Sequence, residues 1–213
     1  MTNPDQSSSQ TAKWIALLSS ADAEERAAGA KRLYGAAREL FLSVASPWLK
    51  DSDFGSLVCS PHLEAAEAAH SAAPAIVAGV AVRPENFERI RAANASPRLA
   101  SVPPDQDAIE FELHFGPRAN GADLDILTTR EPDGSGAIAR FLQRFGEGIQ
   151  QIEICVRDVD RATQILRGKF AVTPIYPQTR AGADGTRVNF FLPSAAEGTK
   201  VLIELVEAPG ARR

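Results

Sequence analysis

The chain has 213 residues, of which 44% are hydrophobic and 23% charged, a composition typical of a globular protein with a buried core. Its formal net charge of -4, without any block of basic residues, argues against a nucleic-acid partner. No apolar run reaches the roughly 18–20 residues that a membrane span requires, so no membrane partner is expected. The polar start has no signal-peptide layout, and Cys59 and Cys155 form no CxxC pattern. We therefore predict a cytoplasmic protein with two free thiols.

The first third of the chain is predicted to be mainly helical. We expect residues 1–11 to be a disordered tail, because they carry almost nothing to bury. A short helix is predicted over 12–18 and an alanine-rich helix over 63–72. Together with a longer helix between them, they make up a helical extension over 12–74.

The longer helix has clear start and stop signals. Asp22 followed by Glu25 has the spacing of a capping box. Apolar residues then recur at helical spacing as far as Val44. Because proline removes a backbone donor and clashes with the preceding turn, Pro47 is predicted to end this helix.

After residue 75 the pattern changes to short strands alternating with helices. Alternation and apolar runs first predict a strand at 76–82, a helix at 85–93 and strands at 108–115 and 123–129. A linker helix is predicted at 137–145. After it come a strand at 149–156, a helix at 159–167 and strands at 171–176, 187–192 and 201–206. We interpret this as two successive βαβββ modules, 75–130 and 146–207, followed by a tail at 208–213. Internal duplication of this kind predicts an α+β fold. Residues 182–185 (GADG) are expected to form a hairpin turn, because Asp-Gly tolerates positive φ.

Three segments of the second module carry a family resemblance: GAIARFLQRFGEGIQQIEICVRDVDRATQILRGKF, AGADGTRVNFFLPS and KVLIELVE. In this order they are similar to the second half of methylmalonyl-CoA epimerases, members of the vicinal-oxygen-chelate (glyoxalase/bleomycin resistance/dioxygenase) superfamily. The resemblance is strong over 137–207, weaker over 75–130 and absent from the helical extension. It implies that the two modules form a curved mixed sheet around a cavity.

The resemblance also implies a metal site, which the family builds from two His, a Gln and a Glu. Glu204 and Gln106 match the glutamate and the glutamine, whereas Gln151 and Val77 stand where the histidines are expected. Imidazole and thiolate are the groups that bind zinc, cobalt or nickel tightly. We therefore predict a site without its transition metal and no cofactor. The alternative is a divalent cation held weakly by the oxygens of Gln106, Gln151 and Glu204.

Strand alternation extends this set in the first module. If Gln106 faces the cavity, Glu110, Glu112 and His114 lie on the same face, because residues two apart in a strand share a side. Alternating polar residues are as often a solvated face as a site. Both interpretations stay open for Glu110 and Glu112.

The second module, and its symmetry with the first, supply the remaining candidates. The same alternation places Glu153 beside Gln151, and internal symmetry gives Asp125 the place that Glu204 holds. Arg187 is a candidate counter-charge for these acids, so it is included among the residues lining the cavity. If the protein is an enzyme, Glu204 and Glu153 are its candidate bases.

Three functions remain open at this point. The first is a glyoxalase-like domain that binds a small molecule in its cavity without the family's transition metal; an acidic cavity favours a cationic ligand. The second is a metal-dependent epimerase, lyase or dioxygenase-type enzyme with a non-standard metal site. The third is a structural role in which the extension covers the cavity or mediates a homodimer, since family members commonly pair. Whether the chain is an enzyme is left open.

Overall fold

The computed structural model describes residues 4–59, 76–117, 121–195 and 198–209, with only the backbone at 4–9. The chain folds into two compact units, one made of Met1–Ala36 and Ala78–Gln150, the other of Ala37–Val77 and Gln151–Arg213. The predicted extension at 12–74 is therefore divided between the two units. The predicted helix at 63–72 lies outside the described residues.

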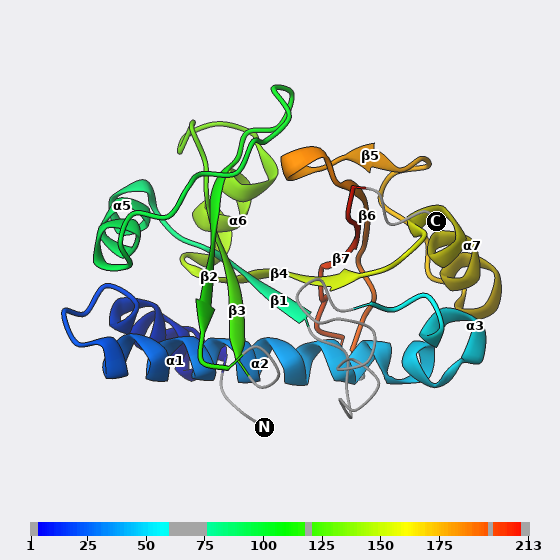
Figure 1. The fold of residues 1–213 in the computed structure, drawn as a ribbon, viewed down its shortest axis with the longest axis horizontal. Coiled ribbons are helices and arrows are strands. Elements are labelled where there is room, and N and C mark those ends of the chain that lie inside the picture. The colour runs from blue at the N-terminus through cyan, green and yellow to red at the C-terminus, as the bar shows by residue number, and fades with distance from the viewer. Residues whose placement is uncertain (1–3, 60–75, 118–120, 196–197, 210–213) are drawn as a thin grey trace. The chain divides into compact units, whose positions relative to one another are not determined.

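Two helices open the chain, α1 at Pro4–Leu17 and α2 at Ala23–Lys50 (Figure 1). Helix α1 begins inside the stretch that was predicted to be disordered, which corrects that boundary. Helix α2 begins where the capping signal placed it, with Asp22 Oδ1 accepting a hydrogen bond from Glu24 N at 2.8 Å. Glu25 instead accepts a hydrogen bond from the hydroxyl of Ser20 at 2.6 Å.

Pro47 does not end α2, so that prediction is wrong. The helix continues to Lys50 because burial of the last turn offsets the lost backbone hydrogen bond. Trp48 is 3% exposed there and packs edge-on against Phe54, with ring centroids 6.1 Å apart. Phe54 belongs to the short helix α3, Ser52–Gly55.

The first unit contains one module of the predicted pattern. It comprises β1 at Ile76–Ala81, which begins in the second unit, α5 at Pro84–Ala93, β2 at Ile109–Phe115, β3 at Ala122–Thr128 and α6 at Ala137–Phe145. Strand β3 lies between its neighbours, parallel to β1 and antiparallel to β2. Within this module only β2 and β3 follow α5, because the described residues 96–108 form no strand. The first module is thus βαββ, which corrects the predicted βαβββ order.

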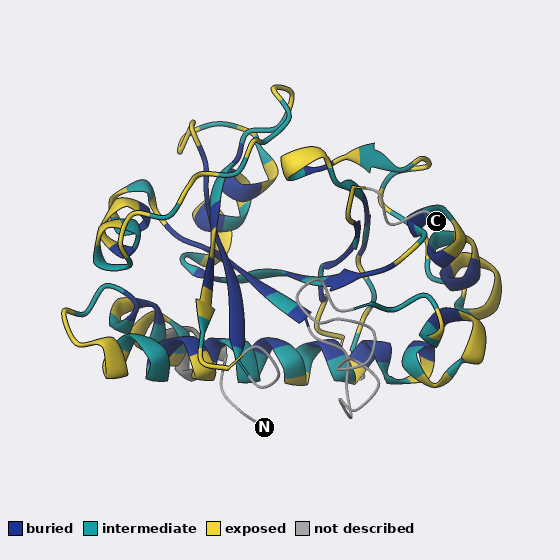
Figure 2. Cartoon of the chain, in the orientation of Figure 1, coloured by how far each residue is buried: buried dark blue, intermediate teal, exposed yellow. Residues whose placement is uncertain are grey.

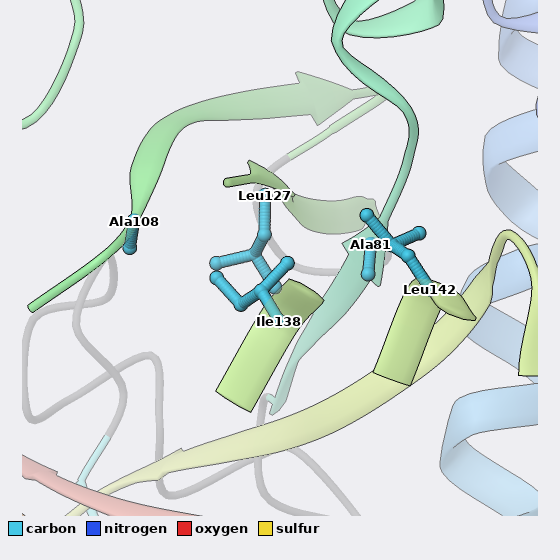
Figure 3. Close-up of a cluster of buried hydrophobic side chains, with 5 residues drawn as sticks. All are labelled: Ala81, Ala108, Leu127, Ile138 and Leu142. Atoms are coloured by element: carbon cyan, nitrogen blue, oxygen red, sulfur yellow. The ribbon is translucent and has the colours of Figure 1, made fainter. Parts of the chain in front are cut away.

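Each face of this sheet is covered by a different helix. On one face Phe87 of α5 meets Phe111 of β2, with ring centroids 4.7 Å apart. On the other, α6 adds its apolar side chains to a buried cluster formed by Ala81, Ala108, Leu127, Ile138 and Leu142 (Figure 3). Strand β3 between them is buried along its whole length (Figure 2).

The second unit contains the other module, in the predicted βαβββ order. Its elements are β4 at Gly148–Cys155, which begins in the first unit, α7 at Val159–Phe170, β5 at Arg180–Ala181, β6 at Arg187–Phe191 and β7 at Ile203–Glu207. The strand order is β4-β7-β6-β5, with β4 and β7 parallel and the other pairs antiparallel. The fold is α+β with mixed strand pairing, as predicted.

The link from α7 to β6 differs from the prediction in one place. No strand forms over 171–176, because Ala171 takes the left-handed conformation that ends α7 and Pro174 makes only an isolated bridge. The second strand of the module is β5 instead. The predicted hairpin turn is confirmed, with φ of +50° at Asp184 and +78° at Gly185 between β5 and β6.

No helix in the described part of the chain is long and apolar enough to cross a bilayer.

Candidate functional site

Two parallel strands of the second unit, β4 and β7, bring a pair of carboxylates together. Their register places Glu153 directly opposite Glu204. Neighbours in β4 on the other face, Ile152 and Ile154, are each 1% exposed and anchor the strand in the core. The predicted alternation of β4 is therefore confirmed, and it turns Gln151 and Glu153 to one side.

A glutamine amide joins the two acids. Gln151 Nε2 donates to Glu204 Oε2 at 2.7 Å and to Glu153 Oε1 at 3.2 Å. Glu204 is 7% exposed, and burial of a carboxylate is costly unless a donor or cation meets it. Since a primary amide has two N–H donors, one Gln can serve both acids. We call these three residues the carboxylate–amide cluster.

Aromatic side chains lie on the same face of the sheet. Phe190 of β6 is directly opposite Glu204, so the two share a side. Tyr176 packs edge-on against Phe190, with centroids 6.0 Å apart. The guanidinium carbon of Arg180 lies 4.6 Å from the centroid of the Tyr176 ring. We call Tyr176, Arg180 and Phe190 the aromatic–arginine group.

Sequence reasoning missed this group. Alternation along β6 contained the signal for Phe190, because it lies on the same side as Val188 and that side faces Glu204. No signal pointed to Tyr176. It lies in the segment between α7 and β5, where the predicted strand does not form.

Arg187 has a different place from the one predicted. It pairs with Glu207 across β6 and β7, three residues from the Phe190–Glu204 pair, so it lies on the opposite face from Glu204. Its Nη1 is 2.9 Å from Glu207 Oε2 and its Nη2 is 2.7 Å from Asp160 Oδ2. The hydrogen bonds to Asp160 and then Glu207 raise the pKa of Arg187. Arg187 therefore does not line the face of the carboxylate–amide cluster.

The first unit gathers the other predicted polar residues on one face. Register places Glu112 opposite Asp125 and His114 opposite Asp123, with Glu110 two residues from Glu112. His114 Nδ1 lies 2.5 Å from Asp123 Oδ1.

Exposure divides these residues into two kinds. Glu112 and His114 are exposed, whereas Asp125 is only 6% exposed. His114 Nε2 lies 2.7 Å from Gly116 O, so both ring nitrogens are engaged. The exposed pair fits the solvated-face interpretation.

Gln106 and Val77 complete the set of predicted ligands. Gln106 lies in a turn before β2, where its N–H donates to Pro103 O at 3.0 Å. Val77 is the second residue of β1 and is half-buried.

The registers of the two modules support the internal symmetry. Glu153 faces Glu204 in the β4–β7 pair, and Gly79 faces Asp125 in the corresponding β1–β3 pair. By this correspondence Asp125 matches Glu204 and Val77 matches Gln151.

The donor set of the carboxylate–amide cluster does not suit a transition metal. It offers carboxylate and amide groups without imidazole or thiolate, and its amide N–H groups already bind the acids. Among the described residues, no group of three or more His, Cys, Asp or Glu side chains is arranged to hold a metal ion.

The fold defined by the two modules is that of the vicinal-oxygen-chelate superfamily. No protein-family model and no curated protein matches the chain. Among solved structures it resembles methylmalonyl-CoA epimerase from Mycobacterium tuberculosis, with 29% identity over 70% of this chain and 95% of that one, at a TM-score of 0.50. A Streptomyces coelicolor methylmalonyl-CoA epimerase variant in complex with 2-nitronate-propionyl-CoA is 26% identical, covering 63% and 96%, at 0.51. A hypothetical protein from Bacillus halodurans is also 26% identical, covering 62% and 91%, at 0.50. The epimerase-like fold predicted from the sequence is confirmed.

Proposed function

We propose that this chain binds a small molecule at the carboxylate–amide cluster, without the transition metal of its structural relatives. The observation that carries this proposal is the pair of hydrogen bonds from Gln151 to Glu204 and Glu153. They give a buried carboxylate a neutral partner where the family uses a cation. The cluster is thereby ordered by the protein's own side chains.

The chemistry of the face indicates the kind of ligand. Two formal negative charges with a neutral amide between them attract a cation on Coulomb grounds. The half-buried rings of Tyr176 and Phe190 add an apolar surface on the same face. A small amine with an aromatic or apolar body would meet both features.

A second function is favoured by the epimerases among the structural relatives. Abstraction of a proton next to a carbonyl needs a base, which Glu204 or Glu153 would supply. The developing enolate oxygen needs an electrophile, and an amide N–H of Gln151 would act in that role. A divalent cation held weakly at the carboxylate–amide cluster is the metal-dependent form of this alternative.

Thermal unfolding with two ligand classes separates the functions. We expect cationic aromatic amines to raise the melting temperature of the wild type, because a ligand that binds only the native state stabilises it. The rise should shrink in Glu204→Gln and persist in Glu112→Gln, which changes an exposed carboxylate in the same way. Stabilisation by acyl-CoA thioesters alone would favour the enzyme and contradict the binding proposal.

Titration with Co²⁺ tests the metal-free part of the proposal. The wild type should show no stoichiometric binding, since oxygen ligands alone hold this ion weakly. Tight one-to-one binding that is lost in Glu204→Gln would overturn this part and restore the metal-dependent enzyme.

A further inference from the structure

Cys59 and Cys155 form a disulfide in this structure, which corrects the prediction of two free thiols. Their Cα atoms are 5.3 Å apart, within the range that a disulfide spans. The bond joins positions 96 residues apart in the sequence, both within the second unit.

The disulfide lies beside a short backbone ladder that attaches residues 57–59 to the end of β4. Arg157 reinforces the ladder, because its Nη1 donates to Ser56 O at 3.1 Å. The ladder itself consists of the antiparallel bridge Val58↔Val156 and the hydrogen bonds from Cys59 N to Cys155 O at 3.0 Å and from Arg157 N to Leu57 O at 2.8 Å.

The two sulfurs differ in their surroundings. Cys155 is 9% exposed and lies on the same side of β4 as Gln151 and Glu153, by alternation. Cys59 is half-buried and lies a few residues after Ser56, which is exposed. An external thiol therefore reaches the Cys59 sulfur more readily.

We propose that this pair is a reversible thiol–disulfide modification site that latches residues 56–59 onto β4. A thiolate of the glutathione or dithiol class attacks Sγ of Cys59, the bond to Cys155 breaks, and Cys155 leaves as a thiolate that takes a proton from water. A second thiolate attacks the reductant's sulfur in the mixed disulfide. This step releases Cys59 as a thiolate and the reductant as its disulfide. Two electrons pass from the two external thiols to the cysteine pair.

Opening the bond removes the covalent link and leaves the segment attached through the ladder and the Arg157 contact. Local opening of an edge segment costs less than global unfolding, so residues 56–59 leave β4 more often in the reduced state. The β4–β7 pairing on the other side of the strand does not depend on the disulfide. This inference does not rest on the proposed ligand.

Amide hydrogen exchange on the full chain measures how often residues 56–59 leave β4. The protein is first equilibrated with glutathione disulfide, and thiol counting by mass spectrometry should find no free cysteine. Dithiothreitol without denaturant should then release two thiols. Exchange at the Cys59 and Arg157 amides should accelerate by about tenfold. The amides of Ile152 and Val156, which donate to Leu202 O and Val206 O, should stay within about twofold.

Cys59→Ser is the matched control, because it removes the more accessible sulfur and leaves buried Cys155 in place. This variant should show the fast exchange at Arg157 with or without dithiothreitol. Two free thiols after treatment with glutathione disulfide would contradict the proposal that Cys59 and Cys155 form a disulfide. A bond that resists dithiothreitol in the native protein would overturn its reversibility. Equal exchange rates in the oxidised and reduced chains would show that the disulfide does not hold residues 56–59 on β4.

Discussion

At the scale of single residues, the most consequential side chain is the neutral amide of Gln151. It lies where the family resemblance predicts a histidine, and it donates to both acids of the carboxylate–amide cluster. A buried acceptor that loses its donor keeps the cost of its desolvation. The stability of this part of the second unit should therefore respond to a change at this one position.

Replacing Gln151 with Met removes the donor at similar volume. We expect the free energy of unfolding to fall by about 1–3 kcal/mol, because Glu204 Oε2 loses its 2.7 Å hydrogen bond in a buried place. Urea unfolding followed by circular dichroism measures the change. Gln164→Met, on an exposed position of α7, should stay within about 0.5 kcal/mol of the wild type. Equal effects from both variants would show that the amide is not needed by the acids.

A second residue-scale prediction concerns Lys169, whose Nζ lies 2.7 Å from the carboxylates of Asp51 and Asp53. The hydrogen bond from Lys169, followed by that from the Phe54 N–H, lowers the pKa of Asp51 below its usual 3.8. Stability from Asp51 is thus present above its usual pKa and is lost as pH falls through the lowered value.

Lys169→Met should move the pKa of Asp51 back toward 3.8, and Lys169→Arg should leave it low. Titration of the Asp51 carboxyl carbon by NMR measures both variants. An unchanged pKa in Lys169→Met would mean that the cap of α3, and not the ion pair, lowers it.

At the scale of elements, α1 packs tightly against α2 at Gly29. A Cβ on Gly29 would lie 2.7 Å from Trp14 O and 2.8 Å from Leu17 Cβ, too close for a real contact. Further along α2, a Cβ on Gly35 would meet no described atom within 4 Å apart from its own stretch of helix backbone. The two glycines therefore separate helix propensity from helix packing.

Gly29→Ala should destabilise the protein by about 1–3 kcal/mol, because the added methyl group forces the helices apart. Gly35→Ala should instead stabilise it by about 0.5–1 kcal/mol through helix propensity alone. Thermal unfolding of both variants under one condition gives the comparison. A stabilised Gly29→Ala would show that α1 does not pack closely on α2 at this position.

Part of the fold could be predicted from the sequence at this scale. Alternation predicted β2 and β3 to within a residue, because the period of a strand is visible locally. Strands β4 and β7 were also predicted to within two residues. It also predicted that Glu153 and Glu204 lie on strands that carry site residues. The Gln151 bridge depends on the register between strands distant in sequence, which no local pattern contains.

Three local signals gave wrong answers for physical reasons. Pro47 stays inside α2 because burial of Trp48 outweighs the missing donor. The strand expected at 171–176 does not form, because Ala171 ends α7 in a left-handed conformation. The pairing of Cys59 with Cys155 depends on how the chain returns to β4 after 96 residues, so composition alone could not predict it.

At the scale of the whole molecule, the boundary between the units does not follow the boundary of the epimerase-like part. The first unit needs Leu18, whose carbonyl accepts from the Asn94 side chain at 2.9 Å. The second needs Val58, which bridges to Val156. Each unit thus combines residues from before 75 with one of the two modules.

A chain shortened to residues 76–213 should therefore be less stable than the full chain, although it keeps both modules. It loses buried side chains of α1, α2 and α3, including Ile15, Leu33 and Phe54, each at most 2% exposed. Differential scanning calorimetry should show a lower or absent unfolding transition. An unchanged melting temperature would mean that the helical segments are dispensable for folding.

The strip formed by residues 57–59 has a further consequence for behaviour in concentrated solution. A strand end whose N–H and C=O groups lose their partner becomes a template on which another chain can add a strand. By occupying the backbone of Cys155 and Arg157, this strip shields the end of β4 from such pairing. The colloidal stability of the protein should thus depend on the redox state of its surroundings, with the reduced chain more prone to self-association.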